Sequence, residues 1–150
     1  MFNNSRIAIY DYVYDLFYNV VTRNVYLMNE PTELTESDKR DGFIVIRLGN
    51  FVDESEFLLS TYGWVRVFVE AFVPPITRGR VSESKFATFE DGINEVIEAA
   101  SGDTNAEFYV EQGSLLSSDD KEQDNQDNQF FVFVKSFIVV ADKEKQLTND

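Results

Sequence analysis

The run Tyr62–Val73 constrains the fold of this chain more than any other stretch. Small or β-branched residues alternate in it with larger or charged residues, and it ends at Pro74 and Pro75. Successive side chains of a strand point to opposite faces, so this alternation predicts a β-strand, and the prolines end it because they donate no ladder hydrogen bond. The first face carries Val65, Val67, Val69, Ala71 and Val73, and the second carries Trp64, Arg66, Phe68, Glu70 and Phe72. We expect a central strand with helices packed on its valine face.

Two amphipathic helices are predicted, over about Ser5–Arg23 and Ser82–Ala100. Apolar residues recur in each at spacings of three and four, which is the period of one helix face. These residues are Ile7, Tyr10, Val13, Tyr14, Phe17, Val20 and Val21 in the first helix and Phe86, Phe89, Ile93, Val96, Ile97 and Ala100 in the second. We interpret the aromatic stripe of the first helix as core packing, and a groove for a partner helix is the alternative. Gly102 is placed to end the second helix in a left-handed conformation.

Further strands are predicted at residues 24–28, 42–48, 106–111 and 130–140, where β-branched and aromatic residues gather. The polar segments 29–41 and 113–128 are predicted to be flexible loops, because they hold too little apolar surface to offset the entropy of ordering. A charged tail follows at 141–150. Runs of strands separated by single helices indicate the α+β class. We therefore expect residues 1–150 to form one domain, a mostly antiparallel sheet of four to five strands with two helices packed on one face.

The composition argues against an enzyme. The chain has no histidine and no cysteine, which removes the commonest general base, the commonest zinc ligand and any thiol nucleophile. It also has no glycine-rich phosphate loop. Asp120, Glu122 and Asp124 have the alternate spacing of a calcium loop, but the glycine and the final bidentate glutamate of such a loop are missing. We expect no catalytic, cofactor-binding or metal-binding residues.

The charge limits the partners of the protein. A formal net charge of -14 makes the average surface repel nucleic acid and anionic membranes. The first residues lack the basic and apolar regions of a secretory signal, and no apolar run approaches the roughly 20 residues that span a bilayer. We expect an intracellular protein that binds neither membranes nor specific nucleic-acid sequences.

The second face of the predicted sheet is the clearest candidate for a binding surface, with Arg66, Phe68 and Glu70 at its centre. Aromatic residues and arginine are enriched in protein–protein interfaces. The expected members of this face are Phe43, Val45, Arg47, Trp64, Arg66, Phe68, Glu70, Phe72, Tyr109, Phe131, Phe133, Lys135 and Phe137. A covering helix or loop from the same chain is the alternative.

The order of these elements resembles one family of viral proteins. The matching features are the helix over 7–21, the strand at 24–26, the strand at 43–46, the long strand over 64–73, the basic turn at 77–80, the helix over 86–100 and two closing strands. In this order the chain resembles the tail-terminator or tail-completion proteins of tailed bacteriophages and, more loosely, the related head-tail connector ring proteins. The acidic segment 113–128 and the very apolar closing strands depart from the family pattern.

The resemblance implies a structural virion protein, a subunit of a homo-oligomeric ring at the phage neck or tail end that joins tail to head. Its partners would be copies of itself and neighbouring tail or connector proteins, with DNA only as passing cargo. Its location would be the virion, and the host cytoplasm during assembly. The alternative is a stand-alone intracellular protein-binding domain of a bacterium or mobile element.

A ring requires two different patches of each subunit to meet, and the sequence offers a pair of opposite charge. Arg78 and Arg80 form a basic turn in a chain with few basic residues. The acidic side of the second predicted helix carries Glu90, Asp91, Glu95 and Glu98. We expect these two patches to meet between neighbouring subunits, and a solvated turn is the alternative.

Overall fold

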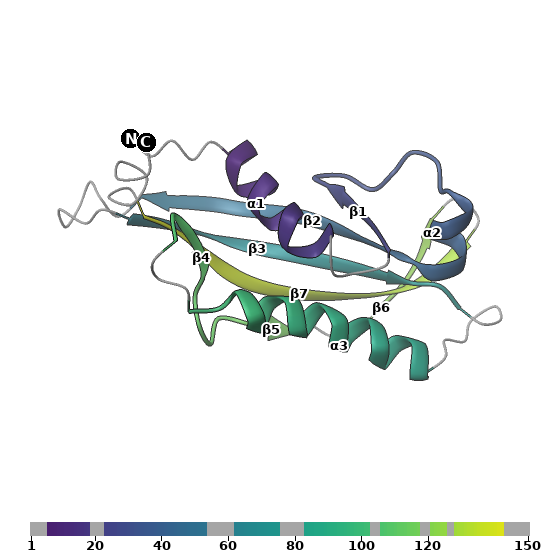
Figure 1. Ribbon diagram of the computed structural model, residues 1–150. Helices are drawn as coiled ribbons and strands as arrows, with labels where there is room; N and C mark the ends of the chain where they lie inside the picture. The colour runs from purple at the N-terminus through teal and green to yellow at the C-terminus, as the bar shows by residue number, and fades with distance from the viewer. Residues whose placement is uncertain are drawn as a thin grey trace.

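The protein has an α+β fold in which two long helices cover one face of a mixed sheet (Figure 1). The computed structural model describes residues 6–18, 23–53, 62–75, 83–102, 106–117, 121–125 and 128–142. The helices are α1 (Arg6–Tyr18), α2 (Glu36–Asp41) and α3 (Glu83–Ala100). The strands are β1 (Asn24–Leu27), β2 (Phe43–Asp53), β3 (Tyr62–Val73), β4 (Phe108–Val110), β5 (Leu116–Ser117), β6 (Lys121–Asn125) and β7 (Asn128–Asp142).

The sheet has the strand order β1-β2-β3-β7-β4. β1 is parallel to β2, and the other pairs are antiparallel. β3 pairs with β2 on one edge and along its whole length with β7 on the other, which confirms the predicted central strand. The far edge of β7 is covered in succession by β4, β5 and β6. The predicted mostly antiparallel sheet with helices on one face is therefore confirmed.

The main core lies between the helices and the valine face of β3. Val65, Val67 and Val69 are fully buried there, in one cluster with Phe17 of α1 and Ile93 of α3. α1 packs over β1 and β2, and α3 packs over β3 and β4 (Figure 1). Burying an aliphatic side chain contributes roughly 1.5–3 kcal/mol, so this layer holds the helices on the sheet.

The first turn of α1 is fixed to an irregular point of β2. The pairing of β2 with β3 shifts register between Leu48 and Phe51, as at a β-bulge. Arg6 donates hydrogen bonds to the carbonyl oxygens of Leu48 (3.0 Å) and Gly49 (2.8 Å), and the Leu48 N–H donates to the Tyr10 hydroxyl at 3.2 Å. Ile7, expected in the apolar stripe, is instead 69% exposed.

The segment 29–41, predicted to be a flexible loop, contains the helix α2. Thr35 caps this helix: its hydroxyl accepts from the Asp38 N–H at 3.1 Å, and the Asp38 carboxylate accepts from the Thr35 N–H at 3.0 Å. The same buried carboxylate accepts from Asn24 Nδ2 at 2.8 Å and from the Tyr26 hydroxyl at 2.7 Å. Hydrogen bonds rather than apolar burial order α2, so a prediction based on hydrophobicity missed it.

The segment 113–128, also predicted to be a loop, contains the strands β5 and β6. β6 pairs with residues 128–132 of β7, and β5 pairs with Lys135 and Ser136. Ladder hydrogen bonds join backbone groups and do not require apolar side chains, so a fully polar sequence can still form an edge strand. The prediction of an irregular segment is wrong for these two strands.

Three of the described glycines, Gly42, Gly102 and Gly113, have the positive φ values that glycine tolerates best, and the first two are at helix ends. Gly102 follows α3 with φ 83°, as predicted. Gly42 joins α2 to β2 with φ 85°, and a Cβ atom there would lie 2.3 Å from the Phe72 carbonyl oxygen. The helix ends predicted within residues 1–5, 19–22 and 81–82, and the tail at 143–150, lie outside the described residues.

Candidate functional site

The second face of the sheet, predicted to be a binding surface, divides into a covered end and a partly exposed middle. Arg66, Phe68 and Glu70 lie on this face and are partly exposed, whereas Phe43 and Phe72 are fully buried. The two parts therefore have different roles.

Aromatic rings fill the covered end. Phe43 stacks on Phe72 with ring centroids 4.5 Å apart, and Phe130 meets both rings edge-on. Leu34, from the segment before α2, packs into this second core, with Tyr26 at its margin. At this end the chain covers its own aromatic residues, so the alternative of a covering loop is correct here.

The partly exposed middle is named the open strip below. It comprises Arg47 of β2, Trp64, Arg66, Phe68 and Glu70 of β3, and Val134 and Ile138 of β7. All of these side chains are neither buried nor fully exposed. Polar and apolar groups therefore alternate across neighbouring strands on one surface.

The charged groups of the open strip have partners on the sheet. Arg47 donates to the Glu70 carboxylate and to the Met28 carbonyl oxygen, and Arg66 donates to the Ser136 hydroxyl at 3.1 Å. Aromatic residues and arginine are enriched in protein–protein interfaces, so the open strip, which carries both, is a candidate protein-binding surface.

The residues of β7 predicted for this face lie on the opposite one. Phe133 and Phe137 belong to the helix-side core, Phe131 packs against it, and Lys135 pairs with α3. In the β3–β7 register Glu70 is opposite Val134 and Phe68 is opposite Ser136, so the even-numbered residues of β7 share the second face. When a strand is apolar on both faces, its sequence does not show whether the odd-numbered or the even-numbered residues face the helices.

Lys135 is a buried charge that sequence analysis placed wrongly. The residue is only 4% exposed. Its ammonium group donates to Glu90 Oε2 and to the Ser117 hydroxyl, both at 2.7 Å. This ion pair joins α3 to β7 and β5. Its only sequence signal is a single lysine within an apolar strand.

The acidic residues predicted to bind a neighbouring subunit separate into two groups. Glu90 is turned toward Lys135, while Asp91, Glu95 and Glu98 are exposed on α3. Arg78 and Arg80, their predicted partners, lie outside the described residues. The predicted contact between subunits stays a prediction.

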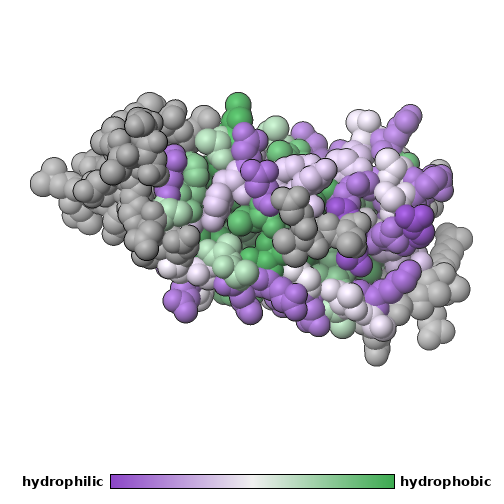
Figure 2. All heavy atoms as spheres, viewed as in Figure 1, coloured by the Kyte–Doolittle hydropathy of each residue, from purple (hydrophilic) through white to green (hydrophobic). Residues whose placement is uncertain are grey.

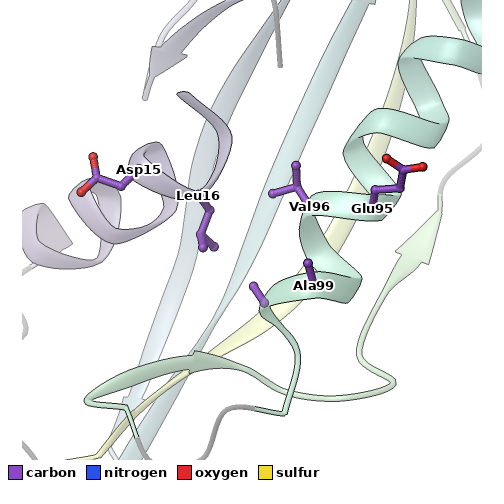
Figure 3. A pocket seen from close by; sticks show the side chains of 6 residues that line it. Asp15, Leu16, Glu95, Val96 and Ala99 are labelled. Atoms are coloured by element: carbon purple, nitrogen blue, oxygen red, sulfur yellow. The ribbon is translucent and has the colours of Figure 1, made fainter. Parts of the chain in front are cut away.

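A groove lies between α1 and α3 (Figure 3), and the α1 residues that line it are not in the aromatic stripe for which a partner-helix groove was the sequence-based alternative. Its volume is about 470 Å³. It is lined by Asp15, Leu16, Glu95, Val96, Ala99 and Ala100. The apolar spacing of each helix was visible in the sequence, but the distance between two helices on a sheet was not.

No family model matches this chain, and no curated protein is similar enough to count as a relative. The open strip and the groove between α1 and α3 are therefore the features that bear on function. Among the described residues, no group of three or more acidic side chains is arranged to hold a metal ion. None of the described helices is both long enough and apolar enough to cross a membrane.

Proposed function

We propose that this protein is a structural, non-enzymatic assembly subunit that forms a homo-oligomeric ring at the neck or tail end of a phage, between tail and head. The observation that carries the proposal is the open strip, a partly exposed sheet face with Phe68 beside the Arg47–Glu70 ion pair and Trp64 farther along β3. Its neighbours in the virion would be tail or connector proteins.

The position of the open strip supports a ring rather than a two-fold dimer. A ring contact joins two different patches, and closure follows when the rotation between subunits is constant. The helices cover one face of the sheet and the open strip lies on the other. The exposed acidic side of α3, with Asp91, Glu95 and Glu98, therefore looks away from the strip, so each subunit offers two unlike surfaces.

The net charge of -14 supports the place of such a ring on the DNA path. An acidic lining repels the phosphate backbone, so DNA passes without binding. The virion, and the host cytoplasm during assembly, are the proposed locations.

A stand-alone protein-binding domain is the second candidate, favoured by the groove between α1 and α3. Such a domain would be monomeric by itself and would bind one partner. Oligomeric state separates the two functions.

The test is the mass of the purified full chain by light scattering over a concentration series, with negative-stain imaging. We expect closed rings for the wild type. Phe68→Asp, which places a charge in the open strip, should dissociate the rings, whereas Ile7→Asp, at an exposed apolar position on the helix side, should keep them. A wild type that remains monomeric, also in mixtures with candidate tail or connector proteins, would contradict the ring and favour the stand-alone domain.

A further inference from the structure

The groove between α1 and α3 is apolar at its floor and open to solvent along its outer side. Leu16 and Val96 point toward each other across it, and Ala99 lies one turn beyond Val96 (Figure 3). Apolar atoms reach the molecular surface between the two helices (Figure 2). Neither Ala99 nor Ala100 has a side chain large enough to close the space. The groove is therefore a depression on the outer surface of the helix layer, and the sheet beneath it stays buried.

Carboxylates stand on both rims of the groove. Asp15 on α1 and Glu95 on α3 are exposed, and their side chains point away from the apolar floor (Figure 3). No ion pair with a described residue engages either of them. The rims therefore attract a cationic partner on both sides of an apolar contact.

These charges distinguish between possible occupants. Nucleic acid would meet repulsion from the two acidic rims, and so would the average surface of a second copy, whose net charge is -14 and which is basic only in short stretches such as the predicted turn at 77–80. A small polar ligand needs convergent polar groups inside its pocket, whereas the groove presents Leu16, Val96 and Ala99. A basic amphipathic protein segment satisfies both the floor and the rims.

We propose that the groove binds an amphipathic helical segment of a partner protein, with its apolar stripe on Leu16, Val96 and Ala99 and with lysine or arginine residues beside Asp15 and Glu95. This is the helix-in-groove mode of recognition, in which anchors at positions i, i+3 or i+4 and i+7 enter an apolar channel. The open strip lies on the other face, but Glu95 also belongs to the acidic side of α3 that the proposed ring uses, so the inference is tested on the monomeric Phe68→Asp variant as well as on the wild type.

The probe is a synthetic helical peptide with leucines at i, i+4 and i+7, lysines on both flanks and a fluorescent label. Binding to the full chain is measured by fluorescence anisotropy at low and at moderate salt. We expect saturable binding that weakens with salt, and no binding of an otherwise identical peptide with glutamates in place of the lysines. Methyl signals of Leu16 and Val96 should shift in NMR spectra when the lysine peptide is added.

Matched variants locate the site. Asp15→Lys with Glu95→Lys reverses both rims and should weaken binding about tenfold. Ala99→Trp should fill the groove and abolish binding. Asp11→Lys with Glu111→Lys makes the same change in net charge at exposed carboxylates that neither line the groove nor belong to the acidic side of α3, and it should keep most of the affinity.

Three results would overturn the inference. The first is no binding of the lysine peptide, and the second is equal weakening in both charge-reversed variants, which would show attraction to the whole acidic surface. The third is self-association that Ala99→Trp removes, which would place a second copy in the groove. Phe68→Asp separates this inference from the proposed ring, because it should dissolve rings and leave peptide binding unchanged.

Discussion

Lys135 and Glu90 form an ion pair with unequal burial, and this inequality predicts unequal mutational effects. The Lys135 side chain is 5% exposed and the Glu90 side chain 35% exposed. A carboxylate that loses its partner can be hydrated from the open side, whereas the ammonium cannot. Glu90→Gln should therefore lower the free energy of unfolding by about 3 kcal/mol, and Lys135→Met by about 1–2 kcal/mol. Urea unfolding of both variants measures the difference, and equal losses would contradict it.

Tyr26 predicts how stability depends on alkaline pH. Burial, the hydrogen bond to Asp38 and the negative charge of Asp38 together raise the pKa of the Tyr26 phenol from 10.0 to about 12. Between these values the folded protein keeps a proton that the unfolded chain loses, so this contribution is complete below the unfolded pKa and is lost as pH rises through the folded one.

The free energy of unfolding should therefore fall more steeply between about pH 10 and pH 12 in the wild type than in Tyr26→Phe. Urea titrations at a series of pH values compare the two slopes. The Tyr26→Phe variant also loses the hydrogen bond to Asp38, which lowers stability at all pH values and does not affect the comparison of slopes. Identical slopes would show that the phenol titrates normally.

At the residue scale the sequence contained one helix signal, a capping box, that a prediction based on hydrophobicity does not detect. Thr35 and Asp38 have the spacing of a capping box, but they stand in a segment of mixed charge that also suits a solvated loop. The buried carboxylate becomes understandable only when β1 brings Asn24 and Tyr26 beside it. Its partners come from another element, so their contact could not be predicted from the segment alone.

At the scale of elements, β3 was predictable and β7 only in part. β3 alternates between small or β-branched residues and larger or charged ones, so the sequence itself separates its two faces. β7 is apolar on both faces, and its parity is fixed only by its pairing with β3. The predicted open surface was therefore correct for Arg66, Phe68 and Glu70 as members of one face, and wrong for Phe133 and Lys135.

Two adjacent positions of β3 give the sharpest test of the two faces. Val67 is fully buried against the helices, while Phe68 is partly exposed in the open strip. Val67→Asp buries an unpaired charge and should cost more than about 4 kcal/mol, whereas Phe68→Asp should cost about 1 kcal/mol in the monomer. Thermal and urea unfolding measure both. Similar losses in the two variants would mean that the strip is closed within the subunit.

At the scale of the whole molecule, charge follows from composition alone, but its distribution does not. The exposed carboxylates of α3 and the rims of the groove lie on the helix side, and the paired charges of Arg47 and Glu70 lie on the other side. Helix periodicity correctly predicted that Asp91, Glu95 and Glu98 of α3 are exposed and was wrong for Glu90, whereas the groove depends on the spacing of α1 and α3 over the sheet. The two candidate surfaces of the protein are thus products of tertiary structure.

The net charge predicts an unusual salt dependence for the proposed ring. Subunits with a charge of -14 repel one another, and this repulsion is screened as the Debye length falls from about 30 Å at 0.01 M salt to about 8 Å at 0.15 M. Association should first increase with salt, and then decrease once the pairing of Arg78 and Arg80 with the acidic side of α3 is screened as well. Light scattering across a salt series at high protein concentration measures both the increase and the decrease of association.

Two charge-reversed variants separate this specific pairing from general repulsion. Arg78→Glu with Arg80→Glu should abolish association at every salt concentration, because it removes the basic patch of the contact. Lys39→Glu with Arg40→Glu makes the same change in net charge at exposed residues of α2, so association should still occur but should begin at a higher salt concentration. Equal behaviour of the two variants would show that net charge alone governs association. A wild type that is monomeric at every salt concentration, also at high protein concentration, would contradict the ring, since screening removes the repulsion between subunits.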